Sequence, residues 1–423
     1  MDHRAGNGGG AMSERIVVIE DALVVDAERP AGERLTVEIR GDRIHDVRQP
    51  GGTVPEGAVV IDGRGHTLMP GLIDAHFHAY ASEFDVFGID SSPTSFVALQ
   101  ASRKLGDALR RGFTTVRDVA GGDRGLRRAI ERGVFDAPDY FYTGPALSQT
   151  GGHGDNHHPG VDSCAEHHHM GVVVDGPIEV RRTIRAFLRD GAHAIKVMAS
   201  GGVASHSDPL HVSQFSLEEL TAAVDEATRF GTYVTAHAYT SDAVQRAVAA
   251  GIAGIEHGNL IDEETIAMMA AAGTTLVPTL IAYEAMARRG AAVGMSEENR
   301  RKNAVVLEKG REATRLAADS GVRVGFGTDL MGDLDDEQLA GFRIHVEVLG
   351  TARAIVSATA VNADIMGLTD RGRIAVGLRA DLVLYPGNVL QDPEVMWTED
   401  AERLVLLAGR DVLSTAPAYA RAG

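Results

Sequence analysis

Apolar residues in the middle of the chain, from about 68 to 365, form short runs separated by longer amphipathic stretches. The short runs are typical of buried β-strands, while stretches such as SLEELTAAVDEATRFG and SDAVQRAVAAG, each with a serine at the predicted N-cap position and a closing glycine, are typical of helices. The runs predict eight strands, at residues 68–78, 114–120, 140–147, 194–200, 233–239, 254–257, 274–280 and 323–329. Their alternation with helices predicts an α/β fold, a (β/α)8 TIM-like barrel.

The two ends of the chain have a different pattern from the middle. Segments such as RLTVEIRGDRIHDV near the start and GRIAVGLRADLVLYPG near the end alternate apolar and polar residues, which predicts antiparallel strands. We therefore predict a disordered leader at residues 1–14, a small β-sandwich domain formed by residues 15–67 plus 366–423, and the barrel at 68–365. A doubly wound open sheet is the alternative for the middle, weakened because we see no GxGxxG or GxxxxGKS/T phosphate loop.

Composition and charge narrow the class of function. The 423 residues carry a net charge of −18, which argues against the basic surface that nucleic acid or an anionic membrane requires. No apolar run approaches the roughly 18–20 residues that span a bilayer, and the start lacks the apolar segment of a signal peptide. Cys164 is the single cysteine, so no intrachain disulfide is expected and a reducing cytoplasm fits best. We expect a cytoplasmic enzyme that acts on a small molecule.

Polar residues occupy the carboxyl ends of several predicted strands, where the chemistry of a barrel enzyme collects. His76 and His78 end the first predicted strand, and because side chains alternate along a strand, they point to the same face. The ends of four later strands carry Lys196, His237, His257 and Asp329. Neutral imidazoles and carboxylates suit Zn²⁺ or a similar first-row ion. The spacing therefore predicts a metal site.

Lys196 needs a separate explanation, because an ammonium group cannot bind a metal. One hypothesis is that it reacts with CO₂ and becomes a carbamate, which could bridge two metal ions about 3.5–4 Å apart. The alternatives are a buried ion pair with Asp329 or a contact with a substrate carboxylate. Asp329 could take a proton from a water and pass it to the leaving group, although a helix N-cap would suit the same position.

These residues together resemble the amidohydrolase superfamily, and the stretches LSQTGGHGD, IKVMASGGVASHSDP and IEHGNLID resemble its Xaa-Pro-dipeptidase-like and imidazolonepropionase-related branch. The resemblance implies hydrolysis of the amide bond of a dipeptide or N-acyl amino acid, with Asp329 as general acid and base. It implies that His153 and Tyr239 contact the substrate, and that the chain forms a homo-oligomer. It also implies two Zn²⁺ per chain and a carbamate on the lysine, with the metal ligands His76, His78, Lys196, His237, His257 and Asp329.

Two other functions remain open at this point. A cyclic-amide, carbamate or urea-type hydrolase, or a deaminase, with one metal would not need Lys196 as a bridge. A non-catalytic metal-binding protein would have no need of Asp329 as a general base. Asp74 shares the face of the first two histidines, and we expect it to support the site rather than bind metal.

Three further patterns carry weaker hypotheses. The histidines between 153 and 169 have no regular spacing, which favours a solvated loop or a lid over a metal site. In the acidic run GDLDDEQ we expect a solvated face, or carboxylates of Asp333, Asp335 or Asp336 that attract a cationic substrate side chain. Arg117 and Asp118 are interpreted as a structural ion pair.

Overall fold

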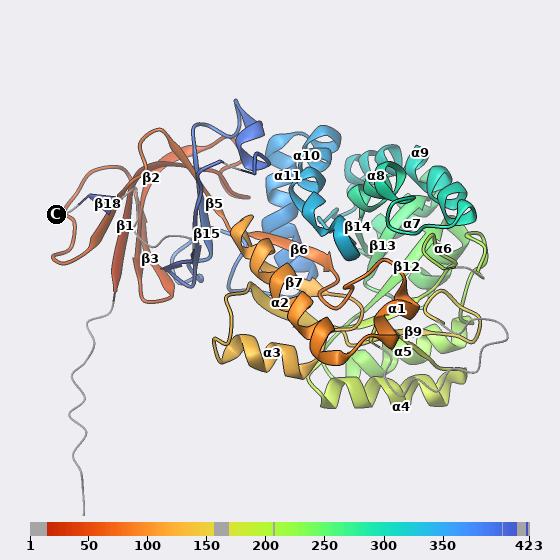
Figure 1. The fold of residues 1–423 in the computed structure, drawn as a ribbon. Helices are drawn as coiled ribbons and strands as arrows, with labels where there is room; N and C mark the ends of the chain where they lie inside the picture. Colours follow the sequence, from red (N-terminus) through yellow and green to blue (C-terminus); the bar gives the residue numbers. More distant parts are fainter. Residues whose placement is uncertain (1–14, 156–168, 206–207, 400, 413–419, 422–423) are drawn as a thin grey trace, which may run out of the picture.

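The computed structural model of the chain describes residues 15–155, 169–205, 208–399, 401–412 and 420–421. Figure 1 shows a β-rich part and a larger part of parallel strands and helices, side by side. Within the described ranges, no helix combines the length and the apolar character that crossing a membrane requires.

Strands from both ends of the chain lie in one nine-stranded sheet, in the order β17-β16-β15-β5-β1-β2-β3, with β4 paired to β1 and to β18. In this sheet β15 is antiparallel to β5, with Val383 opposite Met69. The domain boundaries and the sandwich arrangement stay predictions. The strands are β1 (Ile16–Val24), β2 (Glu33–Arg40), β3 (Arg43–Arg48), β4 (Val59–Asp62), β5 (His66–Pro70), β15 (Leu382–Pro386), β16 (Leu404–Leu407), β17 (Arg410–Asp411) and β18 (Ala420–Arg421).

The larger part contains two parallel sheets, in the orders β6-β7-β8 and β10-β9-β11-β12-β13-β14. The fold is therefore α/β with parallel sheets, consistent with a TIM-barrel-like arrangement. Buried apolar side chains of these strands pack against the surrounding helices, as the short apolar runs indicate. The strands are β6 (Leu72–Phe77), β7 (Phe113–Asp118), β8 (Asp139–Tyr142), β9 (Ala146–Ser148), β10 (Gly171–Val173), β11 (Ile195–Met198), β12 (Val234–Thr240), β13 (Gly254–Leu260) and β14 (Thr275–Val277).

The eighth predicted strand, 323–329, is an extended segment with a single bridge, between Val324 and Leu276. Part of its hydrogen bonding is taken by the Asn362 side chain, whose amide nitrogen donates to the Phe326 carbonyl at 2.7 Å and whose oxygen accepts from the Phe326 amide at 3.0 Å. The segment still lies between β14 and β6, because its backbone hydrogen-bonds to both strands. Closure into a complete eight-stranded barrel stays a prediction.

Helices cover the parallel strands, and their ends follow local sequence rules. Ser216 caps α5 in a capping box with Glu219, as its position predicts. For α6 the predicted cap is wrong by one residue, because Thr240 precedes the helix and Ser241 is its first residue. The helices are α1 (Val86–Ser91), α2 (Thr94–Arg110), α3 (Arg124–Glu131), α4 (Gly176–Arg189), α5 (Leu217–Arg229), α6 (Ser241–Ala249), α7 (Glu263–Ala272), α8 (Leu280–Arg289), α9 (Glu297–Asp319), α10 (Gln338–Leu349), α11 (Thr351–Val356) and α12 (Asn362–Ile365).

Candidate active site

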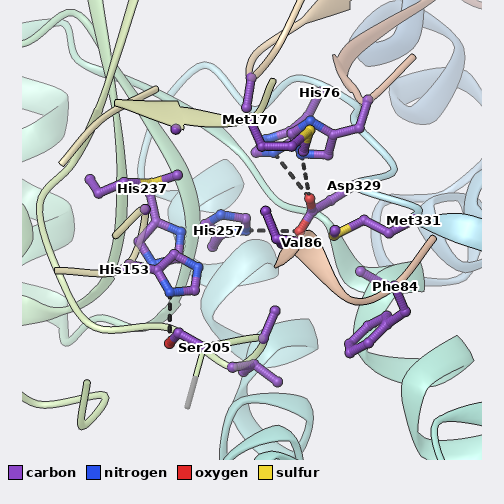
Figure 2. A pocket seen from close by; sticks show the side chains of 18 of the residues that line it. His76, Phe84, Val86, His153, Met170, Ser205, His237, His257, Asp329 and Met331 are labelled. Carbon is purple, nitrogen blue, oxygen red and sulfur yellow. Dashed lines mark hydrogen bonds and ion pairs between the residues drawn. The ribbon is translucent and has the colours of Figure 1, made fainter. Parts of the chain in front are cut away.

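One cavity, drawn in Figure 2, collects every residue that the sequence assigns to the site. The six candidate ligands come from β6, β11, β12 and β13 or from the segments that follow strands, and the two candidate substrate residues lie beside them. The roles of these residues stay predictions, while their convergence is a property of the fold. The eight are His76, His78, His153, Lys196, His237, Tyr239, His257 and Asp329.

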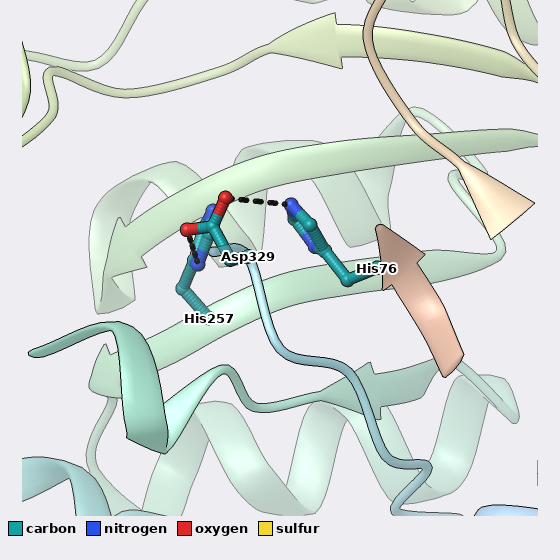
Figure 3. A group of neighbouring side chains, drawn as sticks. All are labelled: His76, His257 and Asp329. Atoms are coloured by element: carbon teal, nitrogen blue, oxygen red, sulfur yellow. Dashed lines mark ion pairs between the residues drawn. The ribbon is translucent and has the colours of Figure 1, made fainter. Parts of the chain in front are cut away.

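His76, His257 and Asp329 form the tightest group, with one potential ligand atom of each lying within 4.8 Å of the others (Figure 3). His76 Nε2 is 3.3 Å from Asp329 Oδ1, and His257 Nδ1 is 3.9 Å from Asp329 Oδ2. The backbones of His257 and Asp329 have φ values of 78° and 56°, in the left-handed region that non-glycine residues seldom adopt. Such strain often accompanies functional sites, where the surroundings hold a side chain in one direction.

Charge and protonation at Asp329 and His78 suit a cation, whereas at His76 burial lowers the pKa but the carboxylates of Asp329 and Glu256 raise it by more. Burial alone would raise the pKa of Asp329. The contacts with His76 and His78 lower it by a larger amount, so that the carboxyl pKa lies well below its ordinary value. Burial lowers the pKa of His78 to about 4, so that its imidazole is neutral at neutral pH and keeps a lone pair. His78 Nε2 lies 2.8 Å from Asp329, while the buried Nδ1 has no hydrogen-bond partner among the described residues.

Glu256, which is not among the predicted site residues, holds His76 from behind. Its carboxylate accepts from His76 Nδ1 at 2.7 Å and from Arg117 at 2.7 Å, and all three side chains are buried. The ion pair predicted between Arg117 and Asp118 is therefore wrong, because neighbouring residues of a strand point to opposite faces. Asp118 accepts instead from the Tyr140 hydroxyl at 2.7 Å. The hydrogen bond from Glu256 fixes the ring of His76 and directs its Nε2 toward Asp329.

Asp74 supports both ends of the same group without lining the cavity. Its carboxylate accepts from the His76 amide at 3.1 Å, from the Thr328 hydroxyl at 2.6 Å and from the Gln338 side chain at 3.0 Å. Burial raises its pKa to about 6. The Asp74 carboxylate thus connects the His76 backbone to Thr328, the residue before Asp329.

Lys196 and His237 complete the candidate ligand set from β11 and β12. Lys196 is 2% exposed, and burial lowers the pKa of its amine to about 8. Its ammonium group makes no hydrogen bond with any described residue, so neither the predicted ion pair with Asp329 nor another partner occupies it. His237 Nε2 lies 3.1 Å from the Gly201 carbonyl, which makes Nδ1 its lone-pair nitrogen.

His153 stacks on His237, with ring centroids 4.4 Å apart, and is held by the segment that follows β11. Its Nδ1 lies 3.0 Å from Ser205 Oγ and 3.3 Å from Asp208 Oδ2. On the far side of this segment, Lys302 of α9 donates hydrogen bonds to the carbonyls of Gly202 at 3.3 Å, Ser205 at 3.1 Å and Asp208 at 2.9 Å. The candidate substrate contact at His153 thus depends on a distant helix.

Most of the remaining wall of the cavity is apolar, although the carboxylates of Asp85 and Asp155 also line it. Figure 2 shows Phe84, Val86, Met170 and Met331 near Asp329, and Met198, Met286 and Leu334 also line the cavity. Methionine side chains are flexible and adapt to irregular apolar groups. This wall suits an uncharged, apolar portion of a ligand.

The carboxylates of the acidic run after the eighth predicted strand do not line the cavity. Asp335 is buried and pairs with Arg103 at 3.1 Å, and Asp336 pairs with Arg289. The hypothesis that these carboxylates attract a cationic substrate side chain therefore loses its basis, because they lie outside the cavity lining and arginines of the chain pair with two of them. Cys164 and the histidines at 157, 158, 167 and 168 lie outside the described residues, while the amide of His169 donates to Asp90 at 2.8 Å.

Lys104 is a second contributor that sequence reasoning missed. Its buried ammonium group donates to the carbonyls of His78 at 3.1 Å and Ala81 at 3.0 Å, and burial lowers its pKa to about 8. A signal for it exists in the sequence, because Lys104 shares the spacing of the apolar positions Ala101, Leu105 and Ala108 on α2. A charged residue on an apolar helix face needs a buried partner.

Comparisons with known proteins give consistent results. The sequence matches the model of the Amidohydrolase family over residues 67–412. It is 32% identical to ochratoxinase from Aspergillus niger over 369 residues, which cover 81% of this chain and 75% of the relative. A crystal structure of a prolidase complexed with N-methylphosphonate-L-proline is 43% identical, with a TM-score of 0.90, and the match covers 94% of this chain and 99% of that one. A Xaa-Pro dipeptidase with methionine bound in its active site is 30% identical, with a TM-score of 0.83 and coverage of 94% and 99%. The resemblance that the sequence motifs indicate is thereby confirmed.

Proposed function

Because the chain belongs to the amidohydrolase family, we propose that it hydrolyses the amide bond of a dipeptide or N-acyl amino acid whose acyl part is uncharged and apolar. The observation that carries this proposal is the convergence of four imidazoles, a lysine and Asp329 on one cavity beside an apolar wall. A protein that only binds metal would not need Asp329 as a general base.

The residues present fit a site for two divalent metal ions. The proposed ligands are His76, His78, His237, His257 and Asp329, with Lys196 as a carbamate between the two ions. The neutral ring of His78 and the direction of its Nε2 toward Asp329 are what a ligand requires. Bound Zn²⁺ would supply Lewis acidity and would lower the pKa of a coordinated water to about 7.

The side chains of the protein would then move protons and hold the substrate. Asp329, ionised because two histidines contact it, takes the proton of the attacking water and delivers it to the amine that leaves. Tyr239 and His153 lie next to His237 and would hold the carbonyl oxygen and the carboxylate of the substrate. Buried carboxylates behind the histidines keep the ligand rings in place before substrate arrives.

The apolar wall and the relatives together support the substrate class. The phosphonate bound by the related prolidase carries a tetrahedral phosphorus on the proline nitrogen, which has the shape of the intermediate in amide hydrolysis. Four methionines, at 170, 198, 286 and 331, line the cavity of this chain, and the carboxylates that line it besides Asp329 are those of Asp85 and Asp155. We therefore propose an apolar residue or acyl group on the carbonyl side of the cleaved bond.

A screen of dipeptides and N-acyl amino acids with the zinc-loaded protein tests the proposal. We expect cleavage of substrates with an apolar acyl part, and kcat/KM at least about tenfold lower for those with Asp or Glu there, because a carboxylate must be desolvated against methionines and is repelled by Asp85 and Asp155. Met331→Lys should reduce the preference for apolar over acidic acyl parts. The absence of any cleaved amide in the screen would overturn the proposal.

Metal content decides between the two-metal and one-metal forms of the site. The two-metal form predicts two Zn²⁺ per chain, a loss of metal in Lys196→Ala, and partial recovery when short carboxylic acids replace the missing carbamate. One Zn²⁺ per chain that is unchanged in Lys196→Ala would favour a one-metal hydrolase or deaminase. Full activity after rigorous chelation would contradict both forms.

A further inference from the structure

A buried tyrosine behind the cavity, Tyr283 on α8, connects two residues of the candidate site. Its hydroxyl donates a hydrogen bond to the Tyr239 hydroxyl at 3.1 Å and lies 2.8 Å from His257 Nδ1. It also lies 3.1 Å from the Thr279 hydroxyl, which itself is 2.8 Å from His257 Nδ1. Tyr239 and His257 line the cavity, whereas Tyr283 and Thr279 lie behind it. No step of the proposed hydrolysis uses Tyr283 directly.

The number of protons sets the direction of these hydrogen bonds. A phenol has one proton, so a Tyr283 hydroxyl that donates to Tyr239 cannot also donate to His257. The short contact between Tyr283 and His257 therefore requires the proton on His257 Nδ1, and the lone pair of the ring is then on Nε2. The hydroxyls of Tyr283 and Thr279 thus both accept from Nδ1 of a candidate metal ligand.

The Tyr283 hydroxyl also determines what Tyr239 can do. The Tyr239 oxygen accepts the proton of Tyr283, and its own proton must therefore point away from Tyr283. Among the described residues no acceptor takes that proton, and Tyr239 borders the cavity. A substrate oxygen in the cavity is the acceptor that this arrangement leaves for Tyr239.

We propose that Tyr283 is a positioning residue that presents Tyr239 as a hydrogen-bond donor to the carbonyl oxygen of the substrate as negative charge develops on it. Donors fixed in advance stabilise such an oxyanion without reorganising during the reaction, which is why a single donor has a large effect on rate. The proposal rests on the proposed amide hydrolysis. It assigns Tyr283 an effect that passes through Tyr239 and not through the metal ligands.

A double-mutant cycle with Tyr239→Phe and Tyr283→Phe tests this path. We expect Tyr239→Phe to lower kcat about 100-fold, as loss of one oxyanion donor does. Tyr283→Phe should lower kcat about tenfold with little change in KM, because Tyr239 keeps its proton but loses its orientation. The double variant should be no slower than Tyr239→Phe, since the second hydroxyl acts only through the first. Losses that multiply in the double variant would overturn the proposal.

Thr279→Val is the matched comparison, because it removes the other acceptor of the same His257 nitrogen. In Tyr283→Phe the threonine still accepts from Nδ1, so zinc content should equal that of the wild type. In Thr279→Val the hydrogen bond between the two tyrosines persists. Adding Tyr239→Phe to Thr279→Val should therefore lower kcat by the same factor as it does in the wild type. Equal loss of zinc in both variants would show that Tyr283 only orients the metal ligand, which would overturn the proposal.

Binding of N-methylphosphonate-L-proline by calorimetry provides a readout that needs no turnover. We expect Tyr283→Phe to weaken the phosphonate at least about fivefold while proline binding changes less than twofold, because only the tetrahedral compound carries the oxyanion. Equal weakening of both would overturn the role of Tyr283 while leaving amide hydrolysis intact. A wild-type protein that neither cleaves amides nor binds the phosphonate would instead overturn the proposed function, and the role of Tyr283 with it.

Discussion

The two sides of the cavity are built in different ways. On the ligand side, which we define as His76, His78, His237, His257 and Asp329, regular strands or the residues directly after them position the side chains, and buried carboxylates hold them from behind. On the substrate side, defined as His153, Ser205 and Asp208, an irregular segment after β11 holds the side chains, and Lys302 holds that segment. The side chain of His76 is 1% exposed and that of His153 is 13% exposed.

This difference separates a preorganised centre from an adjustable rim. The ligand side is set by strand register and by charges that cannot leave without a large desolvation cost. The substrate side depends on hydrogen bonds from side chains to a loop, which open at a lower cost. We therefore expect changes on the ligand side to act on kcat and on folding, and changes on the substrate side to act mainly on KM.

The largest effect is expected at Asp329. Asp329→Asn keeps the shape of the side chain but removes the carboxylate that accepts and returns a proton, so kcat/KM should fall at least about 10³-fold. Steady-state kinetics on the best substrate of the screen measures this. The matched control is Asp333→Asn, an exposed position of the same chain segment, which should keep wild-type kinetics. A loss below about tenfold at Asp329 would contradict its assigned role.

The second effect concerns the support behind the ligand side. Glu256→Gln leaves Arg117 buried without its counter-charge, so the free energy of unfolding should fall by about 3–5 kcal/mol. Zinc affinity should fall about 10–100-fold, because His76 loses its carboxylate partner. Urea unfolding of the metal-free protein and zinc titration measure the two losses, and Glu264→Gln in the exposed first turn of α7 is the control.

The pH dependence of that stability difference has a definite sign. Burial alone would raise the pKa of Glu256. Arg117 and His76 lower it by a larger amount, so that the pKa lies well below the ordinary value for glutamate. A group with a lowered folded pKa stabilises the protein above its unfolded pKa, about 4.3, and loses that contribution as the pH falls toward the folded pKa. The difference between wild type and Glu256→Gln should therefore be constant near neutral pH and shrink below about pH 4. A difference that grows on acidification would contradict the ion pair.

A third effect concerns the contact between the loop and His153. A Cβ added at Gly202 would collide with the His153 ring, so Gly202→Ala should displace that side chain. KM should rise about tenfold, the loss of one hydrogen bond to a charged group, while kcat changes less. The His153→Ala variant should show the same rise, and the double variant should show no further one. Additive losses would mean that Gly202 acts on another group.

The smallest effect is expected at Lys302, farthest from the cavity. Lys302→Met removes three hydrogen bonds to the loop carbonyls but keeps the length of the side chain, and KM should rise about 3–10-fold through a looser loop. Lys309→Met, at an exposed position of the same helix, should leave KM unchanged. A fall in kcat with constant KM at Lys302 would erase the distinction between the two sides of the cavity.

Much of the ligand side is predictable because strand geometry is local. Two-residue periodicity places His76 and His78 on one face, and strand ends on parallel neighbours bring His237 and His257 near them. Residues 323–329 depart from this rule, because the Asn362 side chain takes the place of part of the hydrogen bonding that a neighbouring strand would provide. No pattern within residues 323–329 indicates a partner 36 positions away.

The sequence by itself determined which chemical groups this protein could bring together, because the alternation of side chains in strands and the order of strands and helices are encoded over a few residues. The tertiary structure decided which partner each buried charge takes. Arg117 pairs with Glu256, 139 positions away, and not with its neighbour Asp118, since the two faces of a strand meet different surroundings. It also placed Lys302 and Tyr283 behind the cavity, because helix packing, which depends on the whole chain, sets the distance between groups far apart in sequence.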